Sequence, residues 1–178
     1  MLLEFDFHAK PSGMSSTTLH LFKQNFKFSS AHFLIFDEKN AEKLHGHNYQ
    51  VRVDLVIPPA EQLQETGYFV DFNVFKAGIK AALDEWDEHV LLPRKHPEMN
   101  IKAAHPSLEV RFRDRYYVFP ADEVILLPIT NTSVEQLSRL LAERFYTDFK
   151  SYGVREVCVS VEETRGQAAS TRVGGPAT

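Results

Sequence analysis

The sequence predicts an α+β fold, with helices gathered on one face of an antiparallel sheet. Apolar and polar residues alternate in residues 18–35, 45–57 and 157–163, a pattern typical of β-strands. Apolar residues recur at helical spacing in residues 72–86 and 133–145, a pattern typical of amphipathic helices. The predicted order is therefore two strands, a helix, a hairpin-like segment, a second helix and a final strand.

The first two strands bring three histidines together. Residues 18–35 alternate raggedly and predict one long, bulged strand that ends near His32. After a short polar loop, residues His45–Ile57 predict a second strand, which stops at two prolines because proline cannot donate to a sheet. Because strands this close in sequence readily form an antiparallel pair, we expect His32 to lie beside His45 and His47.

The first helix follows a turn at Gly67 and has Asp71 as its N-cap. It ends in an acidic cluster, residues 84–89. Residues 94–109 contain two prolines and predict a loop, and residues 110–127 predict an extra hairpin.

The second helix begins at Thr132 or Ser133. The run Thr132-Ser133-Val134-Glu135 has the spacing of a capping box, in which a hydroxyl and a carboxylate satisfy free backbone donors reciprocally. The final strand ends at Glu163 and Thr164, and the residues from Gly166 onward are small and polar, which predicts a disordered tail.

Composition indicates a single globular domain, since 43% of the 178 residues are hydrophobic and 25% are charged. We assign residues 17–165 to this domain, residues 1–16 to a flexible extension and residues 166–178 to a flexible tail. A net charge of -4 gives no attraction for nucleic acid or a membrane surface, and no apolar run is long enough to span a bilayer. With one cysteine, Cys158, and no signal peptide pattern, we expect a cytoplasmic protein.

His45 and His47 are the first candidate metal ligands. Residues two apart on a strand point to the same face, so both imidazoles lie side by side, and His32 on the partner strand supplies a third. Three imidazoles suit Zn²⁺ and leave a fourth position open, as in catalytic zinc sites. The alternative is that both are surface histidines on a half-exposed strand.

Carboxylates near these histidines are candidates for proton transfer. Glu42 precedes His45 by three residues and could act as a general base, or be solvated like its charged neighbours. Glu88 next to His89 could set the tautomer of that histidine, or simply belong to a charged helix end. Glu163 could accept two parallel hydrogen bonds from a guanidine-like edge, or face water at a strand terminus.

Six short motifs occur in order between Leu19 and Thr164. They are Phe28-Ser29-Ser30-Ala31-His32, Leu44-His45-Gly46-His47-Asn48-Tyr49, Gly67-Tyr68-Phe69-Val70-Asp71-Phe72, Glu88-His89-Val90-Leu91-Leu92, Thr132-Ser133-Val134-Glu135-Gln136-Leu137 and Val161-Glu162-Glu163-Thr164. Together they resemble the 6-pyruvoyl-tetrahydropterin synthase and 6-carboxy-tetrahydropterin synthase family.

The resemblance implies the tunnelling fold, an antiparallel four-stranded sheet with two helices on one face. It implies trimers that pair into a homohexamer, with active sites at subunit interfaces. It further implies zinc on His32, His45 and His47, and 7,8-dihydroneopterin triphosphate as the substrate. In this family the glutamate matching Glu163 anchors the pterin ring, near the helix start at Thr132 and Ser133.

The chain departs from the family pattern at its catalytic residues. Members that make the pyruvoyl or carboxy product carry a cysteine four residues before the first histidine of the His-Gly-His motif, where this chain has Ala41, and an Asp-His pair where it has Glu88-His89. Glu42 is similar to a subgroup in which glutamate replaces the cysteine and the product is 6-hydroxymethyl-7,8-dihydropterin. We therefore expect Glu42 to be the base of a retro-aldol-like cleavage.

Two alternatives remain: a 6-pyruvoyl- or 6-carboxy-tetrahydropterin synthase that works without the cysteine, and a non-catalytic zinc protein that binds pterins. The segment 94–130 is also longer than the family's short connection. On it, Arg111, Arg113 and Arg115 alternate and could reach a triphosphate, although such arginines more often form the solvent face of a hairpin.

Overall fold

The computed structural model describes residues 16–59, 63 and 65–175. The predicted N-terminal extension, apart from Ser16, lies outside the described residues, as do the last three residues of the predicted tail. The described elements, in chain order, are β1 (Thr17–Leu21), β2 (Lys27–His32), β3 (His45–Ile57), α1 (Phe72–Asp84), β4 (His89–Pro93), β5 (Met99–Ala104), β6 (Ser107–Phe112), β7 (Arg115–Pro120), β8 (Val124–Leu127), α2 (Val134–Phe149), β9 (Glu156–Thr164) and β10 (Gln167–Gly174).

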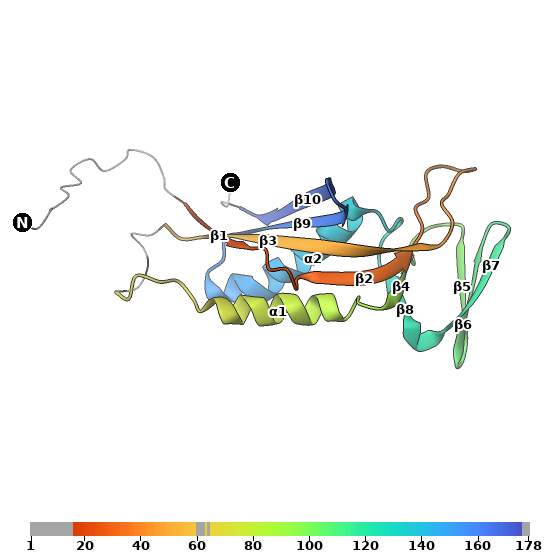
Figure 1. The fold of residues 1–178 in the computed structure, drawn as a ribbon, viewed down its shortest axis with the longest axis horizontal. Helices are drawn as coiled ribbons and strands as arrows, with labels where there is room; N and C mark the ends of the chain where they lie inside the picture. The colour runs from red at the N-terminus through yellow and green to blue at the C-terminus, as the bar shows by residue number, and fades with distance from the viewer. Residues whose placement is uncertain (1–15, 60–62, 64, 176–178) are drawn as a thin grey trace, which may run out of the picture.

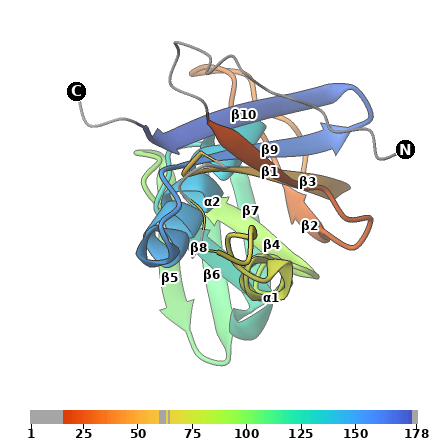
Figure 2. The same cartoon turned by 90° about the vertical axis from the view of Figure 1, so that its left-hand side faces the viewer.

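The main sheet is larger than predicted and is mixed. Its seven strands run in the order β10-β9-β3-β2-β4-β8, with β1 also paired to β3. Both helices lie on one face of this sheet, as predicted (Figures 1 and 2). The expected all-antiparallel, four-stranded sheet is wrong because β4 pairs parallel with both β2 and β8. Strands β4 and β8 are short apolar runs without alternation, so the hydrophobic periodicity of the sequence did not reveal them.

The predicted long first strand is two strands, β1 and β2. A turn separates them, and each pairs with a different part of β3: Thr17 lies opposite Ile57, and His32 opposite His45. The 13-residue strand β3 is long enough to accept both. The irregular alternation therefore marked a turn between two strands rather than a bulge within one strand.

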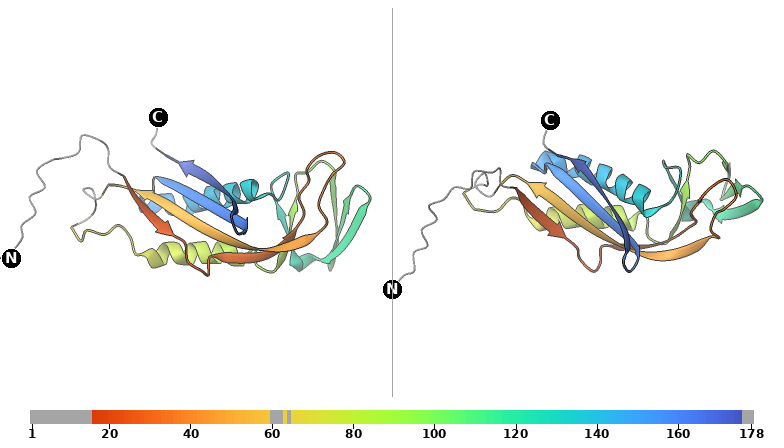
Figure 3. Two further views of the ribbon diagram at one scale, coloured as in Figure 1. Left: turned by 45° about the horizontal axis from the view of Figure 1, so that its top comes forward. Right: turned by 90° about the horizontal axis from the view of Figure 1, so that it is seen from above.

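Residues beyond β4 form a second sheet, β5-β6-β7, where the sequence predicted a loop and one hairpin. All of its pairings are antiparallel. Figure 3 shows this sheet beyond the ends of β2 and β3. It has its own apolar cluster, which includes Phe33, Leu92, Val110 and Phe112. The segment 94–120 is thus a small packed layer beside the loop that joins β2 to β3, and we call it the insertion sheet.

The predicted disordered tail is also wrong for most of its length. Residues 167–174 form β10, which pairs antiparallel with β9 along its whole length. Arg172 adds an ion pair with Glu156, at 2.7 Å. Small polar residues at this sheet edge alternate only weakly in hydrophobicity, which explains why the pattern suggested disorder.

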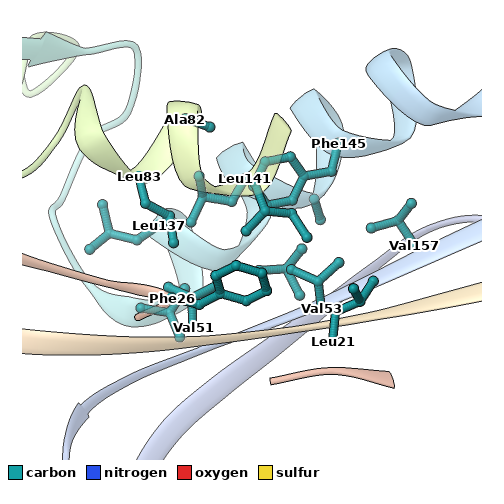
Figure 4. Close-up of a cluster of buried hydrophobic side chains, with 14 of the residues drawn as sticks. Leu21, Phe26, Val51, Val53, Ala82, Leu83, Leu137, Leu141, Phe145 and Val157 are labelled. Carbon is teal, nitrogen blue, oxygen red and sulfur yellow. The ribbon is translucent and has the colours of Figure 1, made fainter. Parts of the chain in front are cut away.

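The main core lies between the sheet and the two helices. Figure 4 shows Val51 and Val53 of β3 facing Leu83 of α1 and Leu141 and Phe145 of α2. Each of these side chains is at most 1% exposed. Neither helix in the described part of the chain has the length and apolar character needed to cross a membrane.

The helix starts differ in how they are capped. Asp71 caps α1 as predicted, because its carboxylate accepts the backbone N–H of Asn73 at 2.8 Å. Ser133 is the N-cap of α2 but makes no capping hydrogen bond to the backbone, so the predicted capping box is not formed. A hydrogen bond from Ser133 instead lowers the pKa of Glu135.

Candidate metal centre

Strand pairing brings His32, His45 and His47 onto one face of the sheet. His32 lies opposite His45 in the β2–β3 pair. His47 is two residues after His45 on the same strand, so its side chain points to the same face of the sheet. One nitrogen from each ring lies within 4.8 Å of the other two. The predicted juxtaposition of the three histidines is therefore confirmed.

Backbone carbonyls set the tautomers of two of these rings. His32 Nδ1 lies 3.1 Å from the Thr132 carbonyl oxygen, and His45 Nδ1 lies 2.8 Å from that of Lys43. Because a carbonyl can only accept, each Nδ1 carries the hydrogen and each Nε2 keeps its lone pair. This outer hydrogen bond is the usual support of a metal-bound histidine.

The three rings fit a divalent metal such as zinc. His32 is fully buried, and no described residue donates a hydrogen bond to its Nε2, so the lone pair of that nitrogen is available to a metal ion. Burial lowers the pKa of His32, which favours the neutral, metal-binding form. The Nε2 atoms of His45 and His47 are 2.8 Å apart, so that two lone pairs would repel unless a proton or cation lies between them. Neutral imidazoles are the nitrogen ligands that Zn²⁺ takes in proteins.

Glu163 lies against the same cluster, although it is far away in the sequence. Its Oε1 is 3.0 Å from His32 Nε2 and 3.7 Å from His47 Nε2. The Tyr49 hydroxyl donates to the same oxygen at 3.2 Å. Burial and the Glu163 carboxylate raise the pKa of Tyr49, which keeps the hydroxyl protonated as a donor. Tyr49 is a site residue that the sequence interpretation missed, although its position two residues after His47 was a signal.

Glu42 lies beside a different histidine of the cluster. Its Oε2 is 3.7 Å from His45 Nε2 and accepts the backbone N–H of Leu34 at 3.1 Å. The backbone N–H of Glu42 donates in turn to the Leu34 carbonyl at 2.8 Å. The cluster is therefore flanked by two carboxylates, one from the β2–β3 loop and one from the end of β9.

Residues just before α2 hold the loop that follows His32. The buried Thr132 donates its hydroxyl to the Phe33 carbonyl at 3.1 Å, in addition to its contact with His32. Asn131 accepts the backbone N–H of Ile35 and donates to its carbonyl, at 3.1 and 2.9 Å. Asn131 was not predicted; a lone asparagine before a helix gives no signal of a partner nearly 100 residues away.

Glu88 and His89 lie in a cavity of about 340 Å³, which His47, Ser29 and Asn48 also line. His89 Nδ1 is 2.5 Å from the Asp87 carbonyl oxygen. Within the described residues, neither Glu88 nor His89 forms a hydrogen bond or ion pair with the two flanking carboxylates. The structure thus brings this pair near one metal-site histidine but not into contact with the candidate base.

The three alternating arginines have three different environments. Arg111 is exposed and stacks on Tyr116, with the guanidinium carbon 4.2 Å from the ring centroid. Arg113 pairs with Glu98 at 2.8 Å. Arg115 points back toward the β2–β3 loop. Solvent-face packing therefore describes Arg111 alone.

Comparison with known proteins identifies the family. The 6-pyruvoyl tetrahydropterin synthase family matches residues 21–173, which is most of the chain, and the protein therefore belongs to that family. This confirms the resemblance that the six motifs suggested.

Relatives and solved structures agree with this placement. The chain is 31% identical to a putative 6-carboxy-5,6,7,8-tetrahydropterin synthase of Methanocaldococcus jannaschii, over 82% of this chain and 89% of that protein. It is 28% identical to a putative enzyme of the same name from Pyrococcus abyssi, over 82% and 85% of the two chains. The structure resembles that of 6-pyruvoyl tetrahydropterin synthase from Plasmodium vivax, with a TM-score of 0.81, 26% identity, and coverage of 90% and 99% of the two chains.

Proposed function

We propose that the protein is a zinc-dependent lyase that acts on the side chain of 7,8-dihydroneopterin triphosphate. The observation that carries this proposal is the pair of carboxylates, Glu42 and Glu163, that flank three metal-competent histidines. One carboxylate serves to bind the substrate and the other to move a proton. The relatives described above carry the names of tetrahydropterin synthases, which supports a pterin substrate.

His32, His45 and His47 would hold the metal ion. When bound there, Zn²⁺ supplies Lewis acidity, which makes a nearby hydroxyl of the substrate easier to deprotonate. Glu163 would anchor the amino-pyrimidine edge of the pterin ring through two parallel hydrogen bonds. Tyr49 orients that carboxylate, and the helix start at Thr132 and Ser133 lies next to the same ring.

Glu42 is the proposed general base. It removes a proton from a side-chain hydroxyl, and the neighbouring carbon–carbon bond then breaks while the pterin ring accepts the electron pair. One solved structure of the Plasmodium vivax protein, 25% identical with a TM-score of 0.80, is described as a variant in which a catalytic glutamate is replaced by alanine. That description supports a glutamate as the base in this chain, where Ala41 stands in place of the usual cysteine.

Two products remain candidates. The names of the relatives favour a 6-pyruvoyl- or 6-carboxy-tetrahydropterin synthase more than the predicted hydroxymethyl product. Glu42 in place of cysteine favours 6-hydroxymethyl-7,8-dihydropterin instead. The routes differ in their second product, because a synthase eliminates free triphosphate whereas cleavage alone leaves the triphosphate on the released fragment.

Glu88 and His89 would act across a subunit boundary, in a homohexamer built from two trimers. In support, Glu88 and His89 line a cavity beside His47 whose lining does not include Glu42. The single buried thiol, Cys158, agrees with a reducing, cytoplasmic location.

The decisive experiment is mass-spectrometric analysis of the products formed from 7,8-dihydroneopterin triphosphate by zinc-loaded protein. We expect a dihydropterin or tetrahydropterin with a shortened or rearranged side chain, and we expect Glu42→Ala to abolish it. Glu38→Ala is the matched control, because Glu38 is exposed in the same loop. Tight pterin binding without turnover would instead indicate a binding protein, and full activity in Glu42→Ala would remove Glu42 as the base.

A further inference from the structure

We propose that the insertion sheet supports the loop that carries Glu42, and that Arg115 is the positioning residue that does so. The inference rests on the proposed function, in which Glu42 is the base. It gives a role to a segment that the family resemblance leaves unexplained. Figure 1 shows the β2–β3 loop rising beside β5 and β7.

Arg115 donates hydrogen bonds to two successive peptide groups of this loop. Its Nη1 donates to the Glu42 carbonyl, and its Nη2 donates to the Ala41 carbonyl at 2.9 Å. A guanidinium presents its donors in a rigid, planar fork, so one side chain can fix the orientation of two neighbouring carbonyls. Lysine, with a single ammonium group on a flexible stem, has no such fork.

Aromatic rings hold the guanidinium in place. Its central carbon lies 5.8 Å from the centroid of Phe33 and 5.9 Å from that of Phe112. Phe33 follows the metal-site residue His32, and Phe112 belongs to β6. Arg115 therefore connects the insertion sheet, the first residue after His32 and the backbone of Glu42.

The backbone position of Glu42 determines where its carboxylate lies. The two ends of this loop are joined to each other. A β-bridge connects Ile35 with Ala41, and two hydrogen bonds connect Glu42 with Leu34. On the other side of the loop, Arg115 binds the carbonyls. The 3.7 Å approach of the Glu42 carboxylate to His45 thus depends on a backbone held from both sides.

This contact pattern argues for positioning rather than phosphate binding. Both terminal nitrogens of Arg115 are committed to backbone carbonyls, which leaves them poorly placed for a triphosphate. Arg113 binds the loop at a different point, through the Asp37 carbonyl at 2.6 Å, and it also pairs with Glu98. Arg111 makes no hydrogen bond or ion pair among the described residues and stacks on Tyr116.

The test compares Arg115→Ala, Arg115→Lys and Arg111→Ala, all with zinc bound. In Arg115→Ala we expect kcat to fall about 100-fold, the effect of misplacing a reacting group by about 1 Å, while KM and bound zinc stay unchanged. Arg115→Lys should recover only part of this loss, and added guanidinium ion should raise the kcat of Arg115→Ala. Arg111→Ala, the matched control from the same sheet, should behave as the unmodified protein.

Hydrogen exchange gives a readout that does not depend on turnover. The Glu42 N–H is bonded to Leu34, and we expect its exchange to speed up in Arg115→Ala but not in Arg111→Ala. If the unmodified protein shows no lyase activity, the proposed function fails, and this exchange measurement still decides the positioning role.

Three results would overturn the inference. A raised KM with unchanged kcat in Arg115→Ala would indicate phosphate binding. An equal loss of kcat in Arg111→Ala would indicate a general effect of positive charge. Unchanged exchange at Glu42 would show that Arg115 does not hold the loop.

Discussion

Replacing His47 with alanine tests the metal centre with little damage to the core. The His47 side chain is 23% exposed, whereas that of His32 is fully buried. Because no closed cavity is left at a partly exposed strand position, we expect the metal-free fold to lose about 0.5–1 kcal/mol at most. The larger effect should be on the affinity for zinc.

The size of that effect follows from the number of ligands. The free energy of zinc binding to a site with four protein ligands is about 10–16 kcal/mol, so one ligand contributes about 3 kcal/mol. Loss of that ligand therefore raises the Kd for zinc about 100-fold. With free zinc at about 100 times the original Kd, bound metal stabilises the unmodified protein by about 2.7 kcal/mol and the variant by about 0.4 kcal/mol. For a chain of 178 residues this difference lowers Tm by about 5–9 °C.

Zinc affinity is measured by competition with a chromophoric chelator, and Tm by scanning fluorimetry with zinc or with EDTA. We expect His47→Ala to have a lower Tm than the unmodified protein when zinc is present, and nearly the same Tm in EDTA. His20→Ala is the control, since His20 is a half-exposed histidine on the neighbouring strand β1. The reasoning is refuted if His47→Ala binds zinc as tightly as the unmodified protein, or if it fails to fold in EDTA.

Three further predictions concern the fold. Phe145→Ala should cost about 3–5 kcal/mol in urea denaturation, because the ring is fully buried and stacked on Phe149; a loss below 1 kcal/mol would contradict the packing described. Asp71→Ala should cost about 1 kcal/mol by removing the cap of α1, whereas Asp71→Asn should retain most of the stability. Burial raises the pKa of Cys158 and so lowers its thiolate fraction, which predicts slow reaction with Ellman's reagent at pH 8 in the folded protein and fast reaction in urea; equal rates would show that the thiol is accessible.

Local sequence patterns were sufficient for the helices and for the histidine cluster. Alternation placed His45 and His47 on one face of a strand, and a short connection made β2 the partner that carries His32. The first signal acts over a few residues of one strand, and the second over the single loop, residues 33–44, that connects two consecutive strands. Capping at Asp71 is equally local, since donor and acceptor lie two residues apart.

Other parts of the fold depend on pairings that leave no trace in local periodicity. The apolar strands β4 and β8 lack alternation, and β10 is small and polar, so that each is recognisable only when its neighbour in the sheet is known. For this reason the predicted four antiparallel strands became a mixed sheet of seven.

The surroundings of the metal centre were decided by tertiary structure in the same way. Glu163 is hydrogen-bonded to Tyr49, which lies 114 residues earlier in the sequence, and Arg115 to Glu42, which lies 73 residues earlier. The sequence by itself determined which groups were available: three imidazoles, a glutamate three residues before His45, and alanine rather than cysteine at position 41. Only long-range packing, which depends on the whole sheet and the insertion sheet, decided which carboxylates approach those imidazoles and what holds them there.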